Sequence, residues 1–267
     1  MSNQDVSANT EYSGEYVSVL TLNLRFGLAD DVDNSWDNRK KTLPPLFKKN
    51  KTDFIGLQEA NAFQIDFIDN FLIDYNYIGK RSPAPFFWQN NIIFYKKTWE
   101  CIYYEHRFLS PTPTVPSRFR KSRWPRQSTI GMFKKKDKIL ICAATHFDFD
   151  ESVQAQSARL IMERISLLPS GVPAVLMGDF NATPYSKCHK LFTGRNNIFK
   201  KPFFKDIFNE PFPATHHGFT GSRDGDYIDW ILYRGGITPI EKMVIYGTIN
   251  GKYPSDHYLV CASFKWA

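Results

Sequence analysis

Residues 175–184 read VLMGDFNATP, and this stretch decides the fold prediction. An apolar run ends in a glycine, and a carboxylate and a carboxamide follow two positions apart. Such a run predicts a buried strand whose polar end lies at the carboxyl edge of a sheet, where α/β proteins bind ligands. In an extended chain Asp179 and Asn181 point to the same side. The pair is suited to orienting a water molecule while a nearby oxyanion is held.

Apolar runs on either side of this stretch predict many strands and few helices. Helices are predicted over 40–49, 62–72 and 153–168, the last with apolar residues along one face. Because strands outnumber helices, we predict an α/β fold in which two mixed β-sheets pack face to face with helices outside. The predicted strands cover residues 17–26, 53–58, 91–95, 101–108, 129–133, 138–145, 175–179, 227–233, 243–246 and 258–264.

The composition is that of a folded, basic protein. The chain has 267 residues, of which 42% are hydrophobic, so it can bury a sizeable core and is not a disordered polypeptide. Its net charge of +7 favours an anionic partner such as a phosphate ester, nucleic acid or a lipid head group. The four cysteines show no CxxC spacing, which predicts free thiols rather than disulfides or a zinc site.

We predict one domain, over residues 16–267, preceded by a disordered leader at residues 1–15. No repeat, low-complexity tract or change of composition divides the chain. The leader lacks the basic and apolar regions of a signal peptide, and no apolar run reaches membrane-spanning length. We therefore expect a cytoplasmic protein with no membrane span. The sequence makes no prediction of oligomeric state.

Six places in the chain share one pattern, in which an apolar run ends in a polar residue of chemical use. Each such residue alone more often closes a turn or makes a structural hydrogen bond. Gathered at one edge of a sheet, they would supply carboxylates for a hard metal ion, a base, and donors for a phosphate. The residues are Asn23, Glu59, His146, Asp179 with Asn181, Asp229, and Asp256 with His257.

In this order the motifs resemble those of the endonuclease/exonuclease/phosphatase superfamily, which includes deoxyribonuclease I, abasic-site endonucleases and inositol-polyphosphate 5-phosphatases. The resemblance runs from about Val17 to the C-terminus and implies a four-layer α/β sandwich. WDNR at 36–39 and HGF at 217–219 further resemble a less-characterised bacterial branch. The superfamily motifs are Asn23, Gln58-Glu59, Thr145-His146, Gly178-Asp179-Phe180-Asn181, Ile228-Asp229-Trp230 and Ser255-Asp256-His257.

The resemblance implies a catalytic role for five of these residues. Asp179 would orient and deprotonate the attacking water, and Asn181 would donate to a non-bridging phosphate oxygen. His257 would contact the scissile phosphate, with its ring oriented by Asp229, because a neighbouring carboxylate favours the imidazolium form. His146 resembles the histidine that acts as the acid toward the leaving group in deoxyribonuclease I.

The resemblance also implies a divalent metal ion. Glu59 would hold Mg²⁺ or Mn²⁺, with Asn23 and Asp256 beside it, since these ions prefer oxygen ligands. Mg²⁺ keeps several waters, so few protein ligands are needed.

A basic loop precedes the strand predicted at 129–133. Its last residue, Arg126, is predicted to bind phosphate, because a guanidinium can grip two phosphate oxygens. Residues 117–126, SRFRKSRWPR, place cations among aromatic residues, as in proteins that bind single-stranded nucleic acid. A solvated surface loop fits this composition equally well. His217 is a weaker candidate for lining the pocket.

The leading functional prediction is a divalent-metal-dependent phosphodiesterase or nuclease. The alternative is a phosphomonoesterase acting on a phosphorylated sugar, inositol or nucleotide. A non-catalytic nucleic-acid-binding module ranks last, because a degenerate copy would have lost Glu59, Asp179 or His257, and all three are present.

Overall fold

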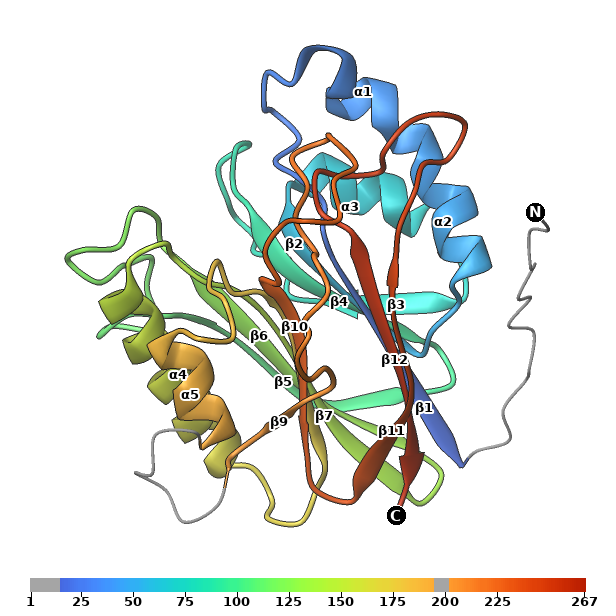
Figure 1. Ribbon diagram of the computed structural model, residues 1–267. Helices are drawn as coiled ribbons and strands as arrows, with labels where there is room; N and C mark the ends of the chain where they lie inside the picture. Colours follow the sequence, from blue (N-terminus) through green and yellow to red (C-terminus); the bar gives the residue numbers. More distant parts are fainter. Residues whose placement is uncertain (1–14, 195–201) are drawn as a thin grey trace.

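The computed structural model describes residues 15–194 and 202–267 (Figure 1). The expected leader, residues 1–15, lies outside the described residues apart from its last position. The described α-helices are α1 Trp36–Arg39, α2 Leu43–Lys49, α3 Ala62–Asp69, α4 Glu151–Ser166 and α5 Lys187–Thr193, with short 3-10 turns at Val32–Asn34 and Lys40–Thr42. No helix in these ranges has the length and apolar character needed to cross a bilayer.

Two six-stranded sheets form the body of the protein. The first has the order β11-β12-β1-β2-β4-β3 and the second β5-β6-β7-β8-β10-β9. In each sheet one central pair is parallel, β1 with β2 and β7 with β8, and the other pairs are antiparallel. The strands are β1 Tyr16–Asn23, β2 Phe54–Ala60, β3 Tyr75–Ile78, β4 Asn90–Lys96, β5 Glu100–Phe108, β6 Gln127–Lys135, β7 Lys138–His146, β8 Ala174–Asp179, β9 Lys205–Asp206, β10 Asp229–Arg234, β11 Ile237–Ile245 and β12 Leu259–Trp266.

Three buried apolar clusters hold four layers together. One lies between the sheets, where Phe54 and Val260 of the first sheet join Leu140 and Met177 of the second. A second cluster packs α1, α2 and α3 on the outer face of the first sheet, and a third packs α4 and α5 on the outer face of the second (Figure 1). The prediction of two mixed sheets packed face to face, with helices outside, is confirmed.

The strand directions bring the polar strand ends to one edge of the sandwich. Asn23 pairs with Gln58 across the parallel β1–β2 pair, and His146 pairs with Asp179 across the parallel β7–β8 pair. β10 runs antiparallel to β8, so its first residue, Asp229, also lies opposite Asp179. Residues far apart in the chain therefore meet because their strands end, or begin, at the same edge.

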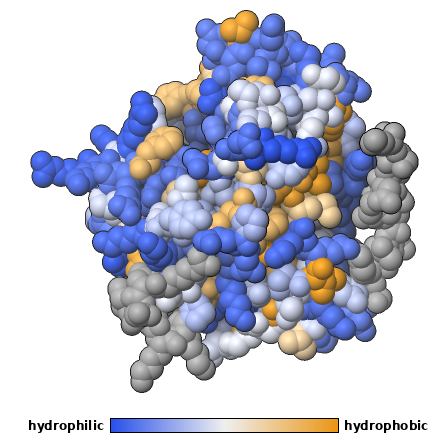
Figure 2. All heavy atoms as spheres, viewed as in Figure 1, coloured by the Kyte–Doolittle hydropathy of each residue, from blue (hydrophilic) through white to orange (hydrophobic). Residues whose placement is uncertain are grey.

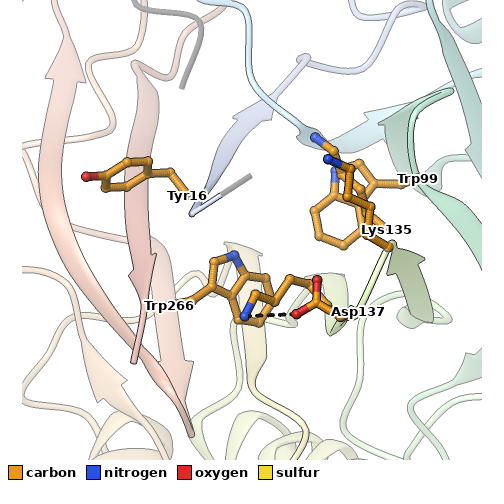
Figure 3. Close-up of a pocket in the computed structure, with 7 residues that line it drawn as sticks. Tyr16, Trp99, Lys135, Asp137 and Trp266 are labelled. Carbon is orange, nitrogen blue, oxygen red and sulfur yellow. Dashed lines mark ion pairs between the residues drawn. The ribbon is translucent and has the colours of Figure 1, made fainter. Parts of the chain in front are cut away.

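The opposite edge carries a small surface pocket of about 20 Å³ (Figure 3). Tyr16 and Trp266, which begin β1 and end β12, line it together with Trp99 and the β6–β7 hairpin. Lys135 lies over the Trp99 ring and Lys138 over the Trp266 ring, so both cations already have aromatic partners. A strand as long as β1 spans roughly 20–25 Å, which separates this pocket from Asn23. The pocket is not part of the site described below.

Candidate active site

Three non-glycine residues next to the strand ends have left-handed backbone conformations. Their φ angles are 59° at Arg25, 57° at Glu59 and 47° at Asn181. Such conformations cost energy, and they concentrate at functional sites, where the surrounding structure enforces them. Gly178 has φ 148°, and a Cβ added there would lie 2.0 Å from the Thr145 carbonyl oxygen. Only glycine therefore lets β8 approach β7 closely enough to place Asp179 beside His146.

The Asp179 carboxylate is the centre of the site and is only 1% exposed. Its Oδ2 accepts a hydrogen bond from Asn23 Nδ2 at 2.9 Å and lies 3.3 Å from His146 Nε2 and 3.9 Å from His257 Nε2. Its Oδ1 accepts the backbone N–H of Asn181 at 2.9 Å. Burial raises the pKa of Asp179, and the His257 imidazolium opposes that rise. A desolvated carboxylate held in this way is a stronger base than one in water.

His257 is held as an imidazolium by the carboxylates around it. Its Nδ1 lies 2.9 Å from Asp229 Oδ2, which fixes the ring and leaves Nε2 facing Asp179. Burial alone would lower the pKa of His257, but Asp229, Asp179 and Asp256 outweigh it and raise the value to about 10. The ring is therefore charged at neutral pH and presents an N–H donor to the centre of the site.

His146 is a neutral imidazole on the other side of Asp179. Burial, followed by the charges of Arg126 and His257, lowers the pKa of His146 well below its ordinary value. Arg126 Nη1 lies 3.1 Å from Nδ1 and can only donate, so the ring proton is on Nε2. Asn181 Nδ2 lies 2.9 Å from this Nε2 and 3.0 Å from the Phe147 carbonyl oxygen. One Asn181 N–H thus faces another donor in place of an acceptor, and a phosphate oxygen placed beside it would satisfy it.

Glu59 lies beside this cluster and is linked to it through Asn23. Asn23 Nδ2 donates to Glu59 Oε1 at 3.2 Å as well as to Asp179, so one amide bridges two carboxylates. The side-chain oxygen of Asn23, Oδ1, accepts the backbone N–H of Arg25 at 2.8 Å. Asn23 thus presents its nitrogen, and not its oxygen, to the other side chains. The arrangement makes Asn23 a spacer between the carboxylates.

The acidic groups around Glu59 fit a hard divalent cation. Burial raises the pKa of Glu59, and the carboxylates of Asp256 and Asp179 raise it further. A cation among these oxygens would relieve their repulsion. Arg25 Nη1 supplies some positive charge 3.6 Å from Asp256 Oδ2. Two compact groups among the described residues could also hold a metal, Asp179 with Asp229 and His257, and His216 with Asp256 and His257. Both use His257, whose protonated ring cannot be a ligand.

Three residues that had no predicted role fix the geometry of the site. Arg39 is buried and donates to the carbonyl oxygens of Leu24, Arg25, Asn34 and Pro254. Ser255 Oγ donates to the backbone carbonyl oxygen of Asn23 at 2.6 Å. Asp148 Oδ2 accepts from Ser122 Oγ and from the backbone N–H groups of Arg123 and Trp124, which anchors the basic loop beside His146. The WDNR motif contained Arg39, but only the fold shows which segments it joins.

The predicted phosphate ligand Arg126 is buried beside His146, and its Nε has no hydrogen-bond partner among the described residues. This orphaned donor is available to an anion. Residues 118–124 of the same loop are mostly exposed, and in the described ranges no carboxylate forms an ion pair with Arg118, Arg120, Lys121 or Arg123. Figure 2 shows strongly hydrophilic side chains projecting at the left of the molecule, next to hydrophobic patches.

All the predicted site residues thus lie at one edge of the sandwich. Residues 20–257, which contain them, match the sequence model of the Endonuclease/Exonuclease/phosphatase family. The chain belongs to this family. Enzymes of the endonuclease/exonuclease/phosphatase superfamily hydrolyse phosphoester bonds. No curated protein matches the chain by sequence.

Solved structures share the endonuclease/exonuclease/phosphatase fold along almost the whole chain. One family protein from Bacteroides thetaiotaomicron has 24% identity and a TM-score of 0.85, over 96% of this chain and 100% of that one. A mannosyl-6-phosphatase from Bacteroides thetaiotaomicron also has 24% identity, with a TM-score of 0.83 over 94% and 100% of the two chains. D. rerio TDP2, solved with a single-strand DNA product, has 15% identity and a TM-score of 0.71 over 94% and 99%.

Proposed function

We propose that the protein is a divalent-metal-dependent phosphodiesterase in which Asp179 activates the attacking water. The observation that carries this proposal is the position of one buried carboxylate, Asp179, between a neutral histidine and a charged one. A base and a cationic phosphate donor must lie within a few ångströms of each other for water to attack a bound phosphorus. His257 Nε2 and Asp179 Oδ2 are 3.9 Å apart, which leaves a substrate oxygen or a water room to contact both.

Three donors would bind the phosphate oxygens. His257 Nε2–H faces the centre of the site, one Asn181 N–H meets His146 Nε2 in place of an acceptor, and Arg126 Nε has no hydrogen-bond partner among the described residues. They come from the segment before β6, the segment after β8 and the segment before β12, so they would contact the phosphate from several sides. Donors fixed in advance in a water-poor site stabilise the charge that develops during attack.

Glu59 would hold the metal ion, with Asp256 beside it and Asn23 keeping Glu59 apart from Asp179. The ion, when bound, neutralises charge on the phosphate and on the departing oxygen. Because the pKa of His146 is lowered, its ring carries one proton at neutral pH and is poorly suited to giving a proton away. We therefore propose that His146 donates a hydrogen bond from Nε2 to the leaving oxygen and is not the acid that the resemblance implied.

A substrate panel tests the proposal. The protein should hydrolyse a bis-aryl phosphodiester, and single-stranded DNA, double-stranded DNA or RNA, in the presence of Mg²⁺ or Mn²⁺, and EDTA should abolish the reaction. The panel includes mannose 6-phosphate, an inositol phosphate and a nucleotide, because a structurally similar protein is a mannosyl-6-phosphatase. Hydrolysis of these monoesters alone would replace the diesterase with the alternative, a phosphomonoesterase. If EDTA leaves the turnover of every substrate unchanged, the metal requirement is contradicted.

The pH profile should depend on Asp229. His257 must stay protonated, so activity is present below its pKa and is lost as the pH rises through that value, which is about 10. Asp229→Asn removes the carboxylate that raises this pKa most. The alkaline limb of kcat/KM against pH should therefore move down by about one to three units.

Asp226→Asn is the matched control for this prediction. Asp226 lies three residues before Asp229, is exposed, and accepts hydrogen bonds from Thr215 and His216 through its backbone oxygen. Its replacement should leave the limb in place. An alkaline limb unmoved in Asp229→Asn would show that His257 does not set it.

A further inference from the structure

Two adjacent histidines, His216 and His217, occupy different environments next to the site. The His217 ring is buried, stacks on Tyr258 with the ring centroids 4.0 Å apart, and accepts the backbone N–H of Gly221. The His216 ring points to His257 instead, with the ring centroids 4.7 Å apart in an edge-to-face arrangement. His217, the weaker candidate from the sequence, supports the loop, whereas His216 reaches the site.

The backbone around His216 is fixed on both sides. Thr215 Oγ1 accepts the backbone N–H groups of Ile228 and Asp229, and the Thr215 carbonyl oxygen accepts that of Tyr258. The backbone of His216 forms an isolated antiparallel β-bridge with the backbone of His257. On its other side, Gly225 approaches so closely that a Cβ there would lie 2.2 Å from the His216 carbonyl oxygen. A side chain on such a segment has a defined position before any ligand binds.

Of the three residues His216, Asp256 and His257, His216 is the one that is open to solvent. A ring nitrogen of His216, a carboxylate oxygen of Asp256 and a ring nitrogen of His257 lie within 4.8 Å of one another. Asp256 and His257 are buried, whereas His216 is partly exposed. Among the described residues, none forms a hydrogen bond with the His216 ring. Its nitrogens are therefore free to meet a substrate that enters from solvent.

We infer that His216 binds the retained arm of a phosphodiester, the ester substituent that stays on phosphorus after cleavage. This inference rests on the proposed function, in which His257 contacts the scissile phosphate. Along the sheet, His146 lies on the β7 side of Asp179, and His257 with His216 lies on the β10 side. If the leaving oxygen departs next to His146, the substituent next to His216 is one that remains.

The partial exposure of His216 suits an arm that continues beyond the phosphate. A group bound between His257 and His216 can extend into solvent, as a nucleoside or another polar alcohol would require. An imidazole ring can hydrogen-bond a polar group of such an arm without demanding a second phosphate. His216 would thus distinguish a diester from a monoester, which has no retained arm.

Two chromogenic substrates with the same leaving group isolate this contact. The p-nitrophenyl ester of thymidine 5′-phosphate has a retained arm, and p-nitrophenyl phosphate has none. His216→Phe preserves a ring against His257 but removes both nitrogens. It should lower kcat/KM for the diester about tenfold, mainly through KM, because one hydrogen bond to the substrate is lost. The same variant should change kcat/KM for the monoester less than twofold, and His216→Gln should recover part of the loss.

His217→Phe is the matched control, because it alters the neighbouring ring without changing a nitrogen that faces the site. It should lower Tm, through loss of the hydrogen bond from Gly221, and leave the diester-to-monoester ratio unchanged. Equal losses on both substrates in His216→Phe, or no loss on either, would overturn the inference. If the unaltered protein cleaves only the monoester, the inference fails and the assignment of a phosphate ester hydrolase survives. If it cleaves neither ester with metal present, the proposed function itself fails.

Discussion

Replacing Asp179 by asparagine is expected to lower kcat by about 10²–10⁴-fold, the usual contribution of a general base. The substitution keeps the shape of the side chain and an oxygen that can accept the backbone N–H of Asn181, whereas the hydrogen bond that Asn23 Nδ2 donates to the second carboxylate oxygen is lost. It also removes the ability to take a proton from water. Because Asp179 is buried with a raised pKa, a neutral replacement should also leave Tm unchanged or higher.

Asp206→Asn is the control for a buried carboxylate outside the site. Asp206 accepts from His189 Nε2 and from the Tyr227 hydroxyl, and it pairs with Leu232, three positions along β10 from Asp229. This variant should have a lower Tm and an unchanged kcat, which is the opposite of the pattern expected for Asp179→Asn. Steady-state kinetics with thermal unfolding of both variants makes the comparison. Full activity in Asp179→Asn would remove Asp179 from the mechanism.

Replacing Glu59 by glutamine is expected to lower kcat/KM by about 10²–10³-fold, because several kcal/mol of charge stabilisation are lost with the metal ion. The variant should also lose the stabilisation that the metal gives to the folded protein. A ligand at 100 times its Kd stabilises by about 2.7 kcal/mol, which raises Tm by several degrees in a chain of this size. Mn²⁺ should therefore raise Tm of the unaltered protein but not of Glu59→Gln.

Glu105→Gln supplies the matched control. Glu105 lies on β5 and accepts hydrogen bonds from Arg107 and Arg164, away from the strand ends that form the site. Its loss should lower Tm without changing the increase caused by Mn²⁺. If Mn²⁺ raises the Tm of Glu59→Gln as much as that of the unaltered protein, the metal binds elsewhere. This measurement needs no enzyme assay.

Long, strongly apolar elements of the fold were predictable from the sequence. β7, β8 and α4 were predicted within a few residues, because each has a continuous apolar run or one apolar face. β3 and α5 were missed, since four residues of YNYI or seven of KCHKLFT are too few to show a period. β9 has two residues and exists only because it pairs with β10. Such elements are specified by their neighbours and not by their own residues.

The candidate site shows the same division. Polar residues that directly end a strand, such as His146 and Asp179, were identified because strand ends collect at one edge. Roles that depend on protonation were not accessible, since the low pKa of His146 comes from burial beside Arg126, which only the packing reveals. His216 was missed for a related reason. Adjacent histidines in a loop look alike in sequence, and the clamp formed by Thr215 and Gly225 decides which one faces His257.

The hydrogen bonds that join Asn23 to Ser255 and Arg39 to Pro254 have a consequence for biosynthesis. They link residues 232 and 215 positions apart, so the first and last parts of the site cannot meet until almost the whole domain has left the ribosome. Contacts of this range also form late in folding. A nascent chain that already contains Glu59, His146 and Asp179 still lacks His257, and it would be inactive toward phosphate esters near the site of synthesis.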